Sequence, residues 1–550
     1  MKKILCMLLA LAMCLPVAAC GGSGDGGENG NGGGDTPAGD ATKIVIYTGG
    51  SSEYTVVKGS DEDRVIAAVE QKYYEDTGVL LDFDVNYLGS SMTSSLAGAI
   101  AGGQQIDIAI SHAKGGNGID DYVIENDLYY DLADLIAEYG SFITQKTGSA
   151  MSNVTTTEGD VIGFPSVINP YKYGILVRKD YMEQAGYTDD PAEVASGKIL
   201  VDNLEDFTDM CVAIKQITGF NYSITGAIWD LEKALVTGAY SDGGYFNYVA
   251  VKDAAGNITS VLPGFALEEY GDILALEYQW AAEDGIISRD ANAMSLSLAE
   301  QEFISGNTGV FMTDPSIDHL ISVARRTRSY AEANGKTAEF TVLPPLTATR
   351  ESTRKGYIRN SEATFIASVL STSRNAEAIV RFVNWMYMDE ENYRLCKYGI
   401  EGEHYIDNGD GTYSYPEGKD EYYTAPPYSG ILALVENQNV SYLEYDGYTE
   451  EEREWLAIAR DENNYVDNDT VDYLMPTNQQ MNSIYETAKN NYYTGVAVPA
   501  WNGRSDPRDI IASVEGQPTR FEQYLKNYLD AAQEYTSWVT NMYTLLLARS

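Results

Sequence analysis

After residue 42 the apolar residues switch repeatedly between a strand period and a helix period, and this alternation restricts the fold more than any other feature. Residues 43–48 read as a strand, and 60–78 carry apolar residues at helical spacing up to a glycine. Residues 79–86 alternate apolar residues with aspartate, which completes a β-α-β unit with a right-handed crossover. A helix over 91–102 then leads into a buried strand over 106–111. Parallel strands joined by helices predict an open α/β sheet, whose ligands bind beyond the carboxyl ends of the strands.

The rest of the chain continues this pattern. We expect strands over 174–179 and 339–344 and a helix over 373–388. An apolar and aromatic stripe over 521–542 predicts helix near the C-terminus. Aromatic residues and alanine are poor choices for a heptad seam, so the stripe is expected to pack on its own domain rather than on a coiled-coil partner.

The balance of charges argues against two classes of partner. The chain has 81 Asp and Glu residues against 37 Lys and Arg residues, a formal net charge of −44. Recognition of nucleic acids begins with a basic footprint, so we expect no nucleic-acid partner. Attachment to anionic lipid through basic patches is disfavoured for the same reason.

The sequence lacks the motifs of the common catalytic sites. It has no GxSxG, residues 335–337 lack the preceding glycine of a P-loop, and no histidine lies in a zinc-protease motif. Asp407, Asp410 and the acidic stretch 461–472 could hold calcium, but none matches the spacing of an EF-hand, and acidic loops are usually just solvated. We therefore expect a protein that is not an enzyme and has no metal and no cofactor.

The N-terminus carries a processing signal. Residues 1–20 combine two lysines, a short apolar run and small residues, which is typical of a secretory signal peptide. They end in Val17-Ala18-Ala19-Cys20, similar to a bacterial lipobox, in which the cysteine becomes the lipidated N-terminus; the alternative is a plain signal peptide that ends in a chance cysteine. Residues 21–42 are rich in glycine and predict a flexible tether. We expect a domain anchored through Cys20 to the outer face of the cytoplasmic membrane of a bacterium.

Several segments together resemble family 1 of the extracellular solute-binding proteins of ABC importers, in particular the lipoproteins thought to bind oligosaccharides. The most specific is YGIEGEHY (398–405), which is similar to a loop motif of that subgroup. The other segments that resemble the family are 106–136, 173–187, 276–290, 303–312 and 341–346. Two stretches depart from the pattern, namely the acidic insert 188–203 and the glycine-rich loop 114–118.

The resemblance implies an α/β protein with a two-lobe periplasmic-binding-protein-like fold of type II, a hinge and a central ligand cleft. By this resemblance lobe 1 comprises 43–165 plus 357–440, and lobe 2 comprises 166–356 plus 441–550. The chain is expected to cross between the lobes at Pro165 and over 347–356.

The resemblance also implies a function and its partners. The protein would be a monomer that captures a carbohydrate, in particular an oligosaccharide, and delivers it to the transmembrane subunits of an ABC permease. Since Cys211 and Cys396 fall in different expected lobes, which must move, we expect both to be free thiols.

The chemistry of sugars indicates which residues would hold the ligand. A sugar needs polar partners for its hydroxyl groups and flat aromatic rings for its C–H faces. Trp229 and Trp501 lie near breaks in the helical pattern, which favours a cleft edge, although packing tryptophans would look the same. Glu401, His404 and Tyr405 come from the subgroup motif, where stabilisation of the loop is an equal alternative.

Further candidates lie next to strand ends. Tyr47 ends the first strand, and His112 directly follows the strand over 106–111. Tyr171 and Tyr173 flank the first expected crossing between lobes, and Asp314 follows a strand and could accept a hydrogen bond from a hydroxyl group.

Three alternatives stay open on the sequence alone. A receptor could take a peptide, a polyamine or another cationic solute, given the negative charge. A tethered glycan hydrolase would need a pair of carboxylates about 5–9.5 Å apart across a cleft, and the carboxylates are too numerous to single out a pair. A purely structural surface protein would bind no ligand.

Overall fold

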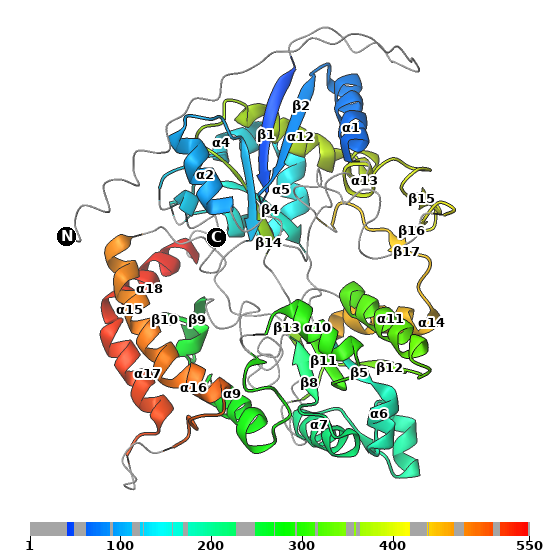
Figure 1. Ribbon diagram of the computed structural model, residues 1–550. Coiled ribbons are helices and arrows are strands. Elements are labelled where there is room, and N and C mark those ends of the chain that lie inside the picture. Colours follow the sequence, from blue (N-terminus) through cyan, green and yellow to red (C-terminus); the bar gives the residue numbers. More distant parts are fainter. Residues whose placement is uncertain are drawn as a thin grey trace, which may run out of the picture. The chain divides into compact units, whose positions relative to one another are not determined.

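In the computed structural model, the helices and strands described below form two modules built on β-sheets and one mainly helical group (Figure 1). All of them belong to the compact unit Ala41–Ser550. It describes residues 41–48, 62–88, 92–112, 122–124, 126–156, 158–168, 174–226, 248–268, 270–291, 294–313, 317–347, 357–358, 363–418, 437, 439–466, 478–509 and 517–547. Within these residues, no helix has both the length and the apolar character that crossing a bilayer requires.

A five-stranded sheet forms the centre of the first module. Its strands are β2 (Leu81–Tyr87), β1 (Thr42–Thr48), β3 (Ile108–His112), β14 (Ala363–Val369) and β4 (Gly163–Ile168), in that order across the sheet. β1 pairs in parallel with β2 and β3, as the β-α-β pattern predicts, and β14 runs antiparallel to both of its neighbours. The interior strand β14, between β3 and β4, therefore comes from a part of the chain remote from the other four.

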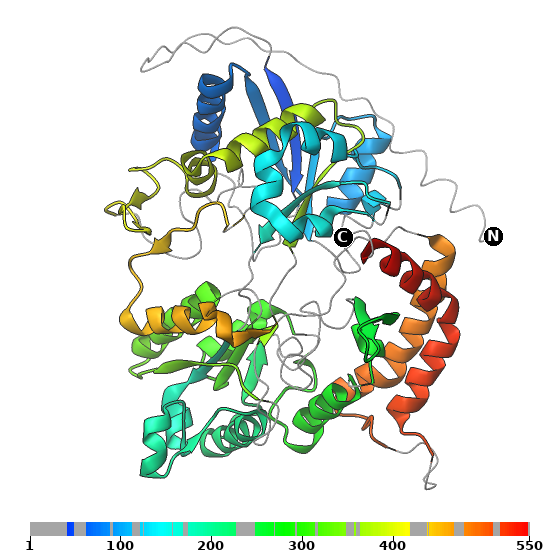
Figure 2. The ribbon, with the colours of Figure 1, turned by 180° about the vertical axis from the view of Figure 1, so that it is seen from behind.

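Helices cover both faces of this first sheet (Figures 1 and 2). Ile108 and Ile110 of β3 belong to one apolar core and Ala109 to another, because successive side chains of a strand point to opposite faces. The first core also takes residues from α1 (Glu62–Thr77), α4 (Ala133–Tyr139), α5 (Ser141–Thr147), α12 (Ala376–Met388) and α13 (Glu390–Tyr398), and the second takes residues from α2 (Met92–Ala101).

The second module repeats this layering around a four-stranded sheet. Its strands are β12 (Phe340–Leu343), β5 (Gly174–Arg178), β11 (Val310–Thr313) and β8 (Ile224–Gly226), in that order. One core against the sheet includes residues of α6 (Lys179–Gln184) and α7 (Leu204–Thr218). The core on the other face includes residues of α10 (Leu296–Ile304), α11 (Ile317–Ala333) and α14 (Glu450–Arg460).

A third, mainly helical group has a core of its own. It contains the hairpin of β9 (Tyr248–Lys252) and β10 (Ile258–Pro263) with α9 (Tyr270–Tyr278), α15 (Gln479–Tyr492), α16 (Val498–Trp501), α17 (Arg520–Ala531) and α18 (Gln533–Leu547). Two π-helical segments, Gln279–Glu283 and Tyr493–Ala497, follow α9 and α15. The stripe predicted over 521–542 forms α17 and α18 and packs into this core, so its packing within the chain is confirmed.

Short elements complete the described fold. They are η2 (Gly148–Val154), β6 (Tyr187–Thr188), η3 (Pro191–Ser196), β7 (Ile199–Leu200), η4 (Gly264–Ala266), β13 (Tyr357–Ile358), β15 (Ile406–Asp407), β16 (Thr412–Ser414), β17 (Glu444–Tyr445), η7 (Glu462–Asn464) and β18 (Tyr465–Val466). The acidic insert 188–203 is an ordered excursion in which β6 and β7 pair in parallel and Asp190 caps η3.

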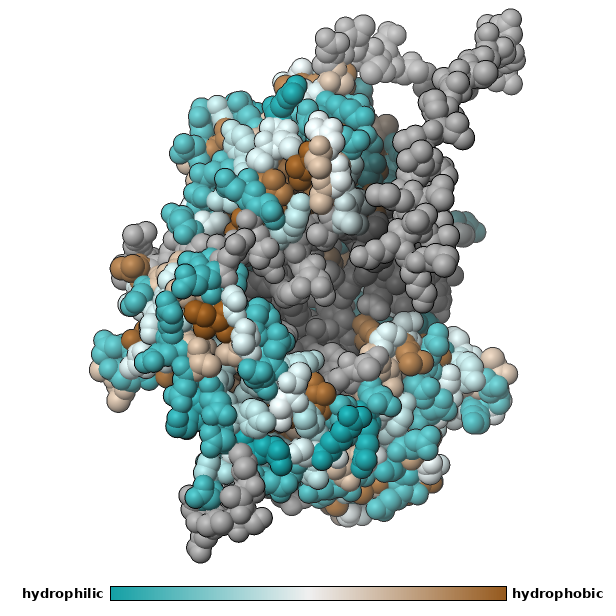
Figure 3. All heavy atoms as spheres, turned by 60° about the vertical axis from the view of Figure 1, so that its left-hand side comes forward, coloured by the Kyte–Doolittle hydropathy of each residue, from teal (hydrophilic) through white to brown (hydrophobic). Residues whose placement is uncertain are grey.

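The surface seen in Figure 3 is largely hydrophilic, and its hydrophobic residues gather in small, separate groups. Large exposed apolar side chains such as Val194, Tyr330 and Leu545 come from separate elements. Scattered apolar residues of this kind are normal for a globular surface.

The prediction of free thiols is confirmed. Cys211 and Cys396 are both unpaired with another cysteine and fully buried. Cys396 lies in the core of the first module and Cys211 in that of the second.

Candidate functional site

Five of the eleven predicted site residues lie outside the described part of the chain. These are the lipidation residue Cys20 and the ligand candidates Tyr171, Tyr173, Trp229 and Asp314. The structure does describe the strands that lead into and out of their loops. The register of these strands therefore fixes where each loop begins.

The sequence segments that contain Trp229 and Asp314 follow two neighbouring strands of the second sheet. Met312 of β11 pairs with Gly226 of β8, and the two strands are parallel. Both strands consequently end at the same edge, where the chain continues into the segments with Trp229 and Asp314. The carboxyl ends of parallel strands are the usual place for ligands in α/β sheets.

Tyr173 precedes a strand that begins at this same edge. β5 runs antiparallel to β11, and its first residue, Gly174, pairs with Thr313 at the end of β11. Residues 169–173, which contain Tyr171, join the end of β4 to Gly174. A connection of this length spans at most ~20 Å, so the edge of the second sheet lies within that distance of the end of β4.

Tyr47 and His112 lie at the matching edge of the first sheet. Both β3 and β4 are antiparallel to β14, so β1, β3 and β4 all end at one edge. His112 is the last residue of β3, where it pairs with Phe365 of β14. Tyr47 is half-buried and packs on the apolar core that includes Leu96 of α2.

Six of the predicted ligand residues lie at these strand ends or in the sequence segments that adjoin them. They are Tyr47, His112, Tyr171, Tyr173, Trp229 and Asp314. As ligand contacts, all six stay predictions.

Glu401, His404 and Tyr405 lie in a tight turn directly after α13. His404 is buried, and its Nδ1 accepts a hydrogen bond from the backbone N–H of Ile400 at 2.9 Å. Tyr405 is also buried, and burial raises the pKa of its hydroxyl group to about 12. Glu401 is exposed and forms a β-bridge with Tyr405. These contacts are of the loop-stabilising kind, and a ligand role for the three residues stays a prediction.

Trp501 belongs to the helical group. Its ring is half-buried and packs edge-on against Tyr493, with ring centroids 5.3 Å apart. Tyr493 begins the second π-helical segment, a kind of distortion that often occurs at functional sites. Trp501 is therefore at least partly a packing residue, and its contact with a ligand stays a prediction.

One polar group between α10 and α11 was not predicted from the sequence. Glu300 of α10 lies 2.9 Å from Nε2 of His319 and 2.6 Å from Arg326, both on α11. Burial opposes ionisation of Glu300, but hydrogen bonds from His319 and Arg326 outweigh it and lower the pKa of the carboxyl group. No motif signals this group, because packing of α10 on α11 brings its members together. α11 begins directly after the segment that contains Asp314.

The candidate calcium ligands have protein partners. Asp407 pairs with Arg394 at 2.6 Å, and Asp410 accepts hydrogen bonds from the backbone and the hydroxyl group of Thr412. Among the residues that the structure describes, no three side chains of the metal-ligating types form a group that could hold an ion.

No family model and no curated protein matches the chain. Solved structures match it over most of its length. The N-glycan transport solute-binding protein NgtS of Streptococcus pneumoniae has a TM-score of 0.59 and 15% identity, and the match covers 90% of this chain and 99% of that one. A human-milk-oligosaccharide-binding solute-binding protein associated with an ABC transporter, from Bifidobacterium longum infantis, has a TM-score of 0.60 and 13% identity over 92% and 99% of the two chains.

The chain has the two-lobe fold of solute-binding proteins. Another extracellular solute-binding protein of Bifidobacterium longum subsp. infantis agrees, with a TM-score of 0.61 and 12% identity over 92% of this chain and all of that one. The predicted α/β class and the predicted two-lobe fold are therefore confirmed. The two sheet modules correspond to two lobes of this solute-binding fold, and the boundaries predicted for the lobes stay predictions.

Proposed function

We propose that the protein is the extracellular binding component of an ABC importer and that it captures an oligosaccharide. One observation carries the proposal. Tyr47 and His112 lie where strands of the first sheet end, the sequence segments with Tyr171, Tyr173, Trp229 and Asp314 adjoin strand ends of the second sheet, and five residues connect the two sets of strand ends.

The residue types in these loops suit a sugar. Aromatic rings pack against the apolar faces of a pyranose, and tyrosine and tryptophan lose little conformational entropy when they do so. Aspartate accepts hydrogen bonds from paired hydroxyl groups. The similar proteins support the same class of ligand, since one of them is named for N-glycan transport and another for binding human milk oligosaccharides.

We also propose that Cys20 carries the lipid anchor and that the loaded protein docks on the membrane subunits of a permease. The lipobox-like ending of residues 1–20 and the glycine-rich segment after it support the anchor. A Cys20→Ala variant should leave the membrane pellet on fractionation. If the Cys20→Ala variant stays in the membrane pellet as fully as the parent protein, the proposal of a lipid anchor at Cys20 is wrong.

Thermal unfolding with a panel of glycans tests the ligand class. The panel should contain Man5GlcNAc, human milk oligosaccharides, malto-oligosaccharides and plant glycan fragments. A glycan at 100 times its dissociation constant stabilises the folded protein by about 2.7 kcal/mol, which raises the melting temperature by several degrees. If a peptide or a polyamine raises the melting temperature and no glycan does, the proposed ligand class is wrong, but the proposal of a solute-binding protein stands. Consumption of a glycan would contradict a binding protein altogether.

Variants at Trp229 and Asp314 test the proposed ligand site. Trp229→Ala and Asp314→Asn should abolish most of the glycan-induced shift. Tyr330→Ala is the matched control, because Tyr330 is an exposed aromatic residue near the far end of α11, ~20 Å along the helix from its start. A full shift in Trp229→Ala and Asp314→Asn would place the ligand elsewhere.

A further inference from the structure

Tyrosine side chains form a connected cluster around the small sheet of β15, β16 and β17, and the cluster as a whole has no role in the proposed function. We name Tyr398, Tyr405, Tyr413, Tyr415, Tyr445 and Tyr448 the tyrosine cluster. Tyr413 packs on Tyr398 and on Tyr445, with ring centroids 5.5 Å apart in both pairs. Tyr445 packs on Tyr448 at 5.4 Å, and Tyr398 packs on Tyr405 at 5.5 Å. Aromatic rings at such distances and tilted angles attract each other.

Within the cluster, Tyr413 and Tyr415 form a pair with an additional contact. Tyr413 lies on β16 and Tyr415 directly follows this strand, so the two side chains leave the extended backbone on the same face. Their ring centroids are 5.5 Å apart, and their hydroxyl oxygens are only 3.4 Å apart. Tyr415 also lies 5.3 Å from Tyr445 between ring centroids. The pair therefore brings both its rings and its hydroxyl groups together.

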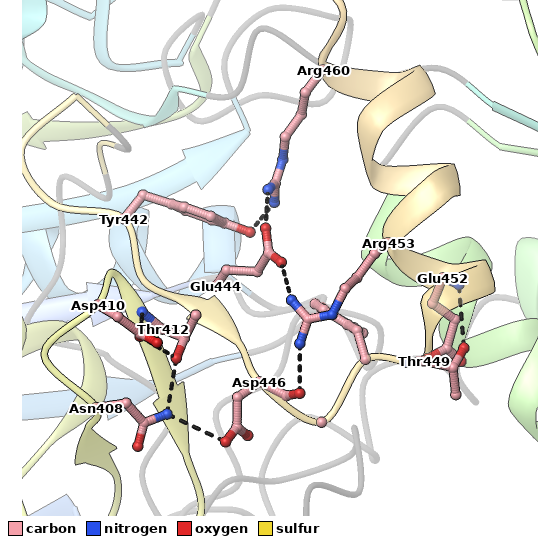
Figure 4. Close-up of polar contacts among 12 residues, drawn as sticks. Asn408, Asp410, Thr412, Tyr442, Glu444, Asp446, Thr449, Glu452, Arg453 and Arg460 are labelled. Atoms are coloured by element: carbon pink, nitrogen blue, oxygen red, sulfur yellow. Dashed lines mark hydrogen bonds and ion pairs between the residues drawn. The ribbon is translucent and has the colours of Figure 1, made fainter.

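The neighbouring strand holds this geometry in place. Tyr445 of β17 pairs with Tyr413 in the register of the small sheet. As Figure 4 shows, Glu444 of β17 accepts hydrogen bonds from Arg453 at 2.8 Å and from Arg460 at 2.7 Å. Both arginines belong to α14, so β17 is fastened to this helix. The ring of Tyr445 is thus fixed beside the pair, which limits how far the two rings of the pair can separate.

The tyrosine pair is also accessible. Tyr413, Tyr415 and Tyr445 are half-buried, so part of each side chain faces solvent. A small oxidant can reach these rings, and a proton released from a hydroxyl group can pass to water. Both conditions are needed for the oxidation of a phenol.

Oxidation of two adjacent phenols leads to a defined product. Each phenol gives one electron to a one-electron oxidant, such as a peroxyl radical, and releases its hydroxyl proton. The unpaired electron of the resulting phenoxyl radical is shared with the ring carbons next to the carbon that carries oxygen. Two such carbons form a bond, and the hydrogen atom on each then moves to its oxygen, which restores both hydroxyl groups. The product, dityrosine, has lost two electrons to the oxidant and two protons to water.

We propose that Tyr413 and Tyr415 are a site of oxidative cross-linking and form dityrosine when the protein meets a one-electron oxidant. The contact between their hydroxyl groups places the carbons that must join near each other, and proximity of this kind favours coupling over other fates of the radicals. Rings in contact exchange an electron readily, so a radical formed on another tyrosine of the cluster also reaches the pair. The proposal does not depend on the identity of any ligand.

Oxidation of the ligand-free protein, from residue 21 onwards, tests the site. Photochemically generated tris(bipyridyl)ruthenium(III) is a suitable one-electron oxidant. Mass spectrometry of the digested protein should find a peptide that lacks two hydrogen atoms, and fragmentation should locate the loss to residues 413–415. The peptide should come from the monomer band of a denaturing gel, because the bond lies within one chain. Absence of this product, or its occurrence only in cross-linked dimers, would overturn the proposal.

The variant Tyr415→Phe removes one hydroxyl group and keeps the ring. It should abolish the product, because the coupling needs two phenols. The same loss of mass within residues 413–415 of the variant would overturn the proposal. If Tyr415→Phe fails to fold, Tyr413→Phe replaces it for the same chemical reason, and the same two outcomes apply.

Tyr485 and Tyr535 are the matched control pair within the same chain. Their rings stack with centroids 4.8 Å apart, closer than those of Tyr413 and Tyr415, but both residues are buried in the core of the helical group. This pair should give no cross-linked peptide, because burial excludes the oxidant and blocks the release of protons. A yield equal to that of Tyr413 and Tyr415 would mean that ring contact alone decides, and would overturn the proposed site.

Discussion

Gly399 shows how much the YGIEGEHY loop depends on a single residue. Its φ is +87°, and a Cβ at this position would lie 2.9 Å from Cγ of the buried His404. Both the backbone conformation and the imidazole ring therefore require glycine here. The loop motif that drew attention as a ligand site is at the same time a closely packed turn.

We predict that Gly399→Ala lowers the free energy of unfolding by about 3 kcal/mol, because strain at positive φ adds to the clash with His404. Gly402→Ala is the control, since Gly402 also has a positive φ, of +80°, but has open space around it. It should cost only about 1–2 kcal/mol. Urea unfolding of both variants gives the comparison, and equal losses would mean that His404 does not constrain the loop.

Glu452 should make the stability of the second lobe dependent on pH. Burial opposes its ionisation, but Arg325 and Thr449 hold the carboxylate and lower its pKa below the ordinary value. A lowered pKa in the folded state means that the stabilisation is fully present above the unfolded pKa, about 4.3, and is lost as the pH falls through the folded value.

The variant Glu452→Gln tests this dependence. At pH 6 it should lose about 2 kcal/mol of unfolding free energy, because Arg325 keeps only a neutral partner. The gap to the parent protein should shrink as the pH falls below about 4.3. Glu450→Gln, an exposed position in the same helical turn, is the control. A gap that stays constant down to pH 3 would contradict the role of Glu452.

At the scale of elements, the sequence predicted what depends on local period. The strand over 43–48 and the helices over 60–78 and 373–388 appear as β1, α1 and α12, with ends shifted by a few residues. Alternating aspartates in 79–86 correctly marked β2, since the strand has one face in the core. The helix expected over 91–102 appears as α2.

Elements and contacts that depend on distant residues could not be predicted in this way. β14 carries no signal that places it between β3 and β4, because its position depends on the pairing of the whole sheet. Glu300 and His319 meet only when α10 packs on α11. For the candidate site, spacing identified strand ends such as Tyr47 and His112, but the loop contacts of His404 were visible only in three dimensions.

At the scale of the whole molecule, each lobe contains one natural reporter of its own unfolding. Cys211 and Cys396 are buried in separate cores, and burial raises the pKa of both thiols. Thiolate formation and access are both suppressed in the folded state.

We predict that a thiol reagent modifies neither cysteine in the native chain from residue 21 onwards, and both when it is unfolded in urea. Mass spectrometry at intermediate urea concentrations then shows whether the two lobes unfold together. If the lobes are energetically independent, the two peptides are labelled at different midpoints. Modification of either cysteine without denaturant would contradict its burial.

The position of β14 has a consequence for biogenesis. β3 and β4 are made early, yet the strand that pairs with both is synthesised roughly 200 residues after β4, a delay of ~10–40 s at ordinary translation rates. During that interval the nascent chain exposes two open strand edges, which are templates for association with other chains. The surplus of acidic residues, a net charge of −44, makes such unfinished chains repel each other. The charge that argues against nucleic acid as a partner would thus also protect the protein while it is incomplete.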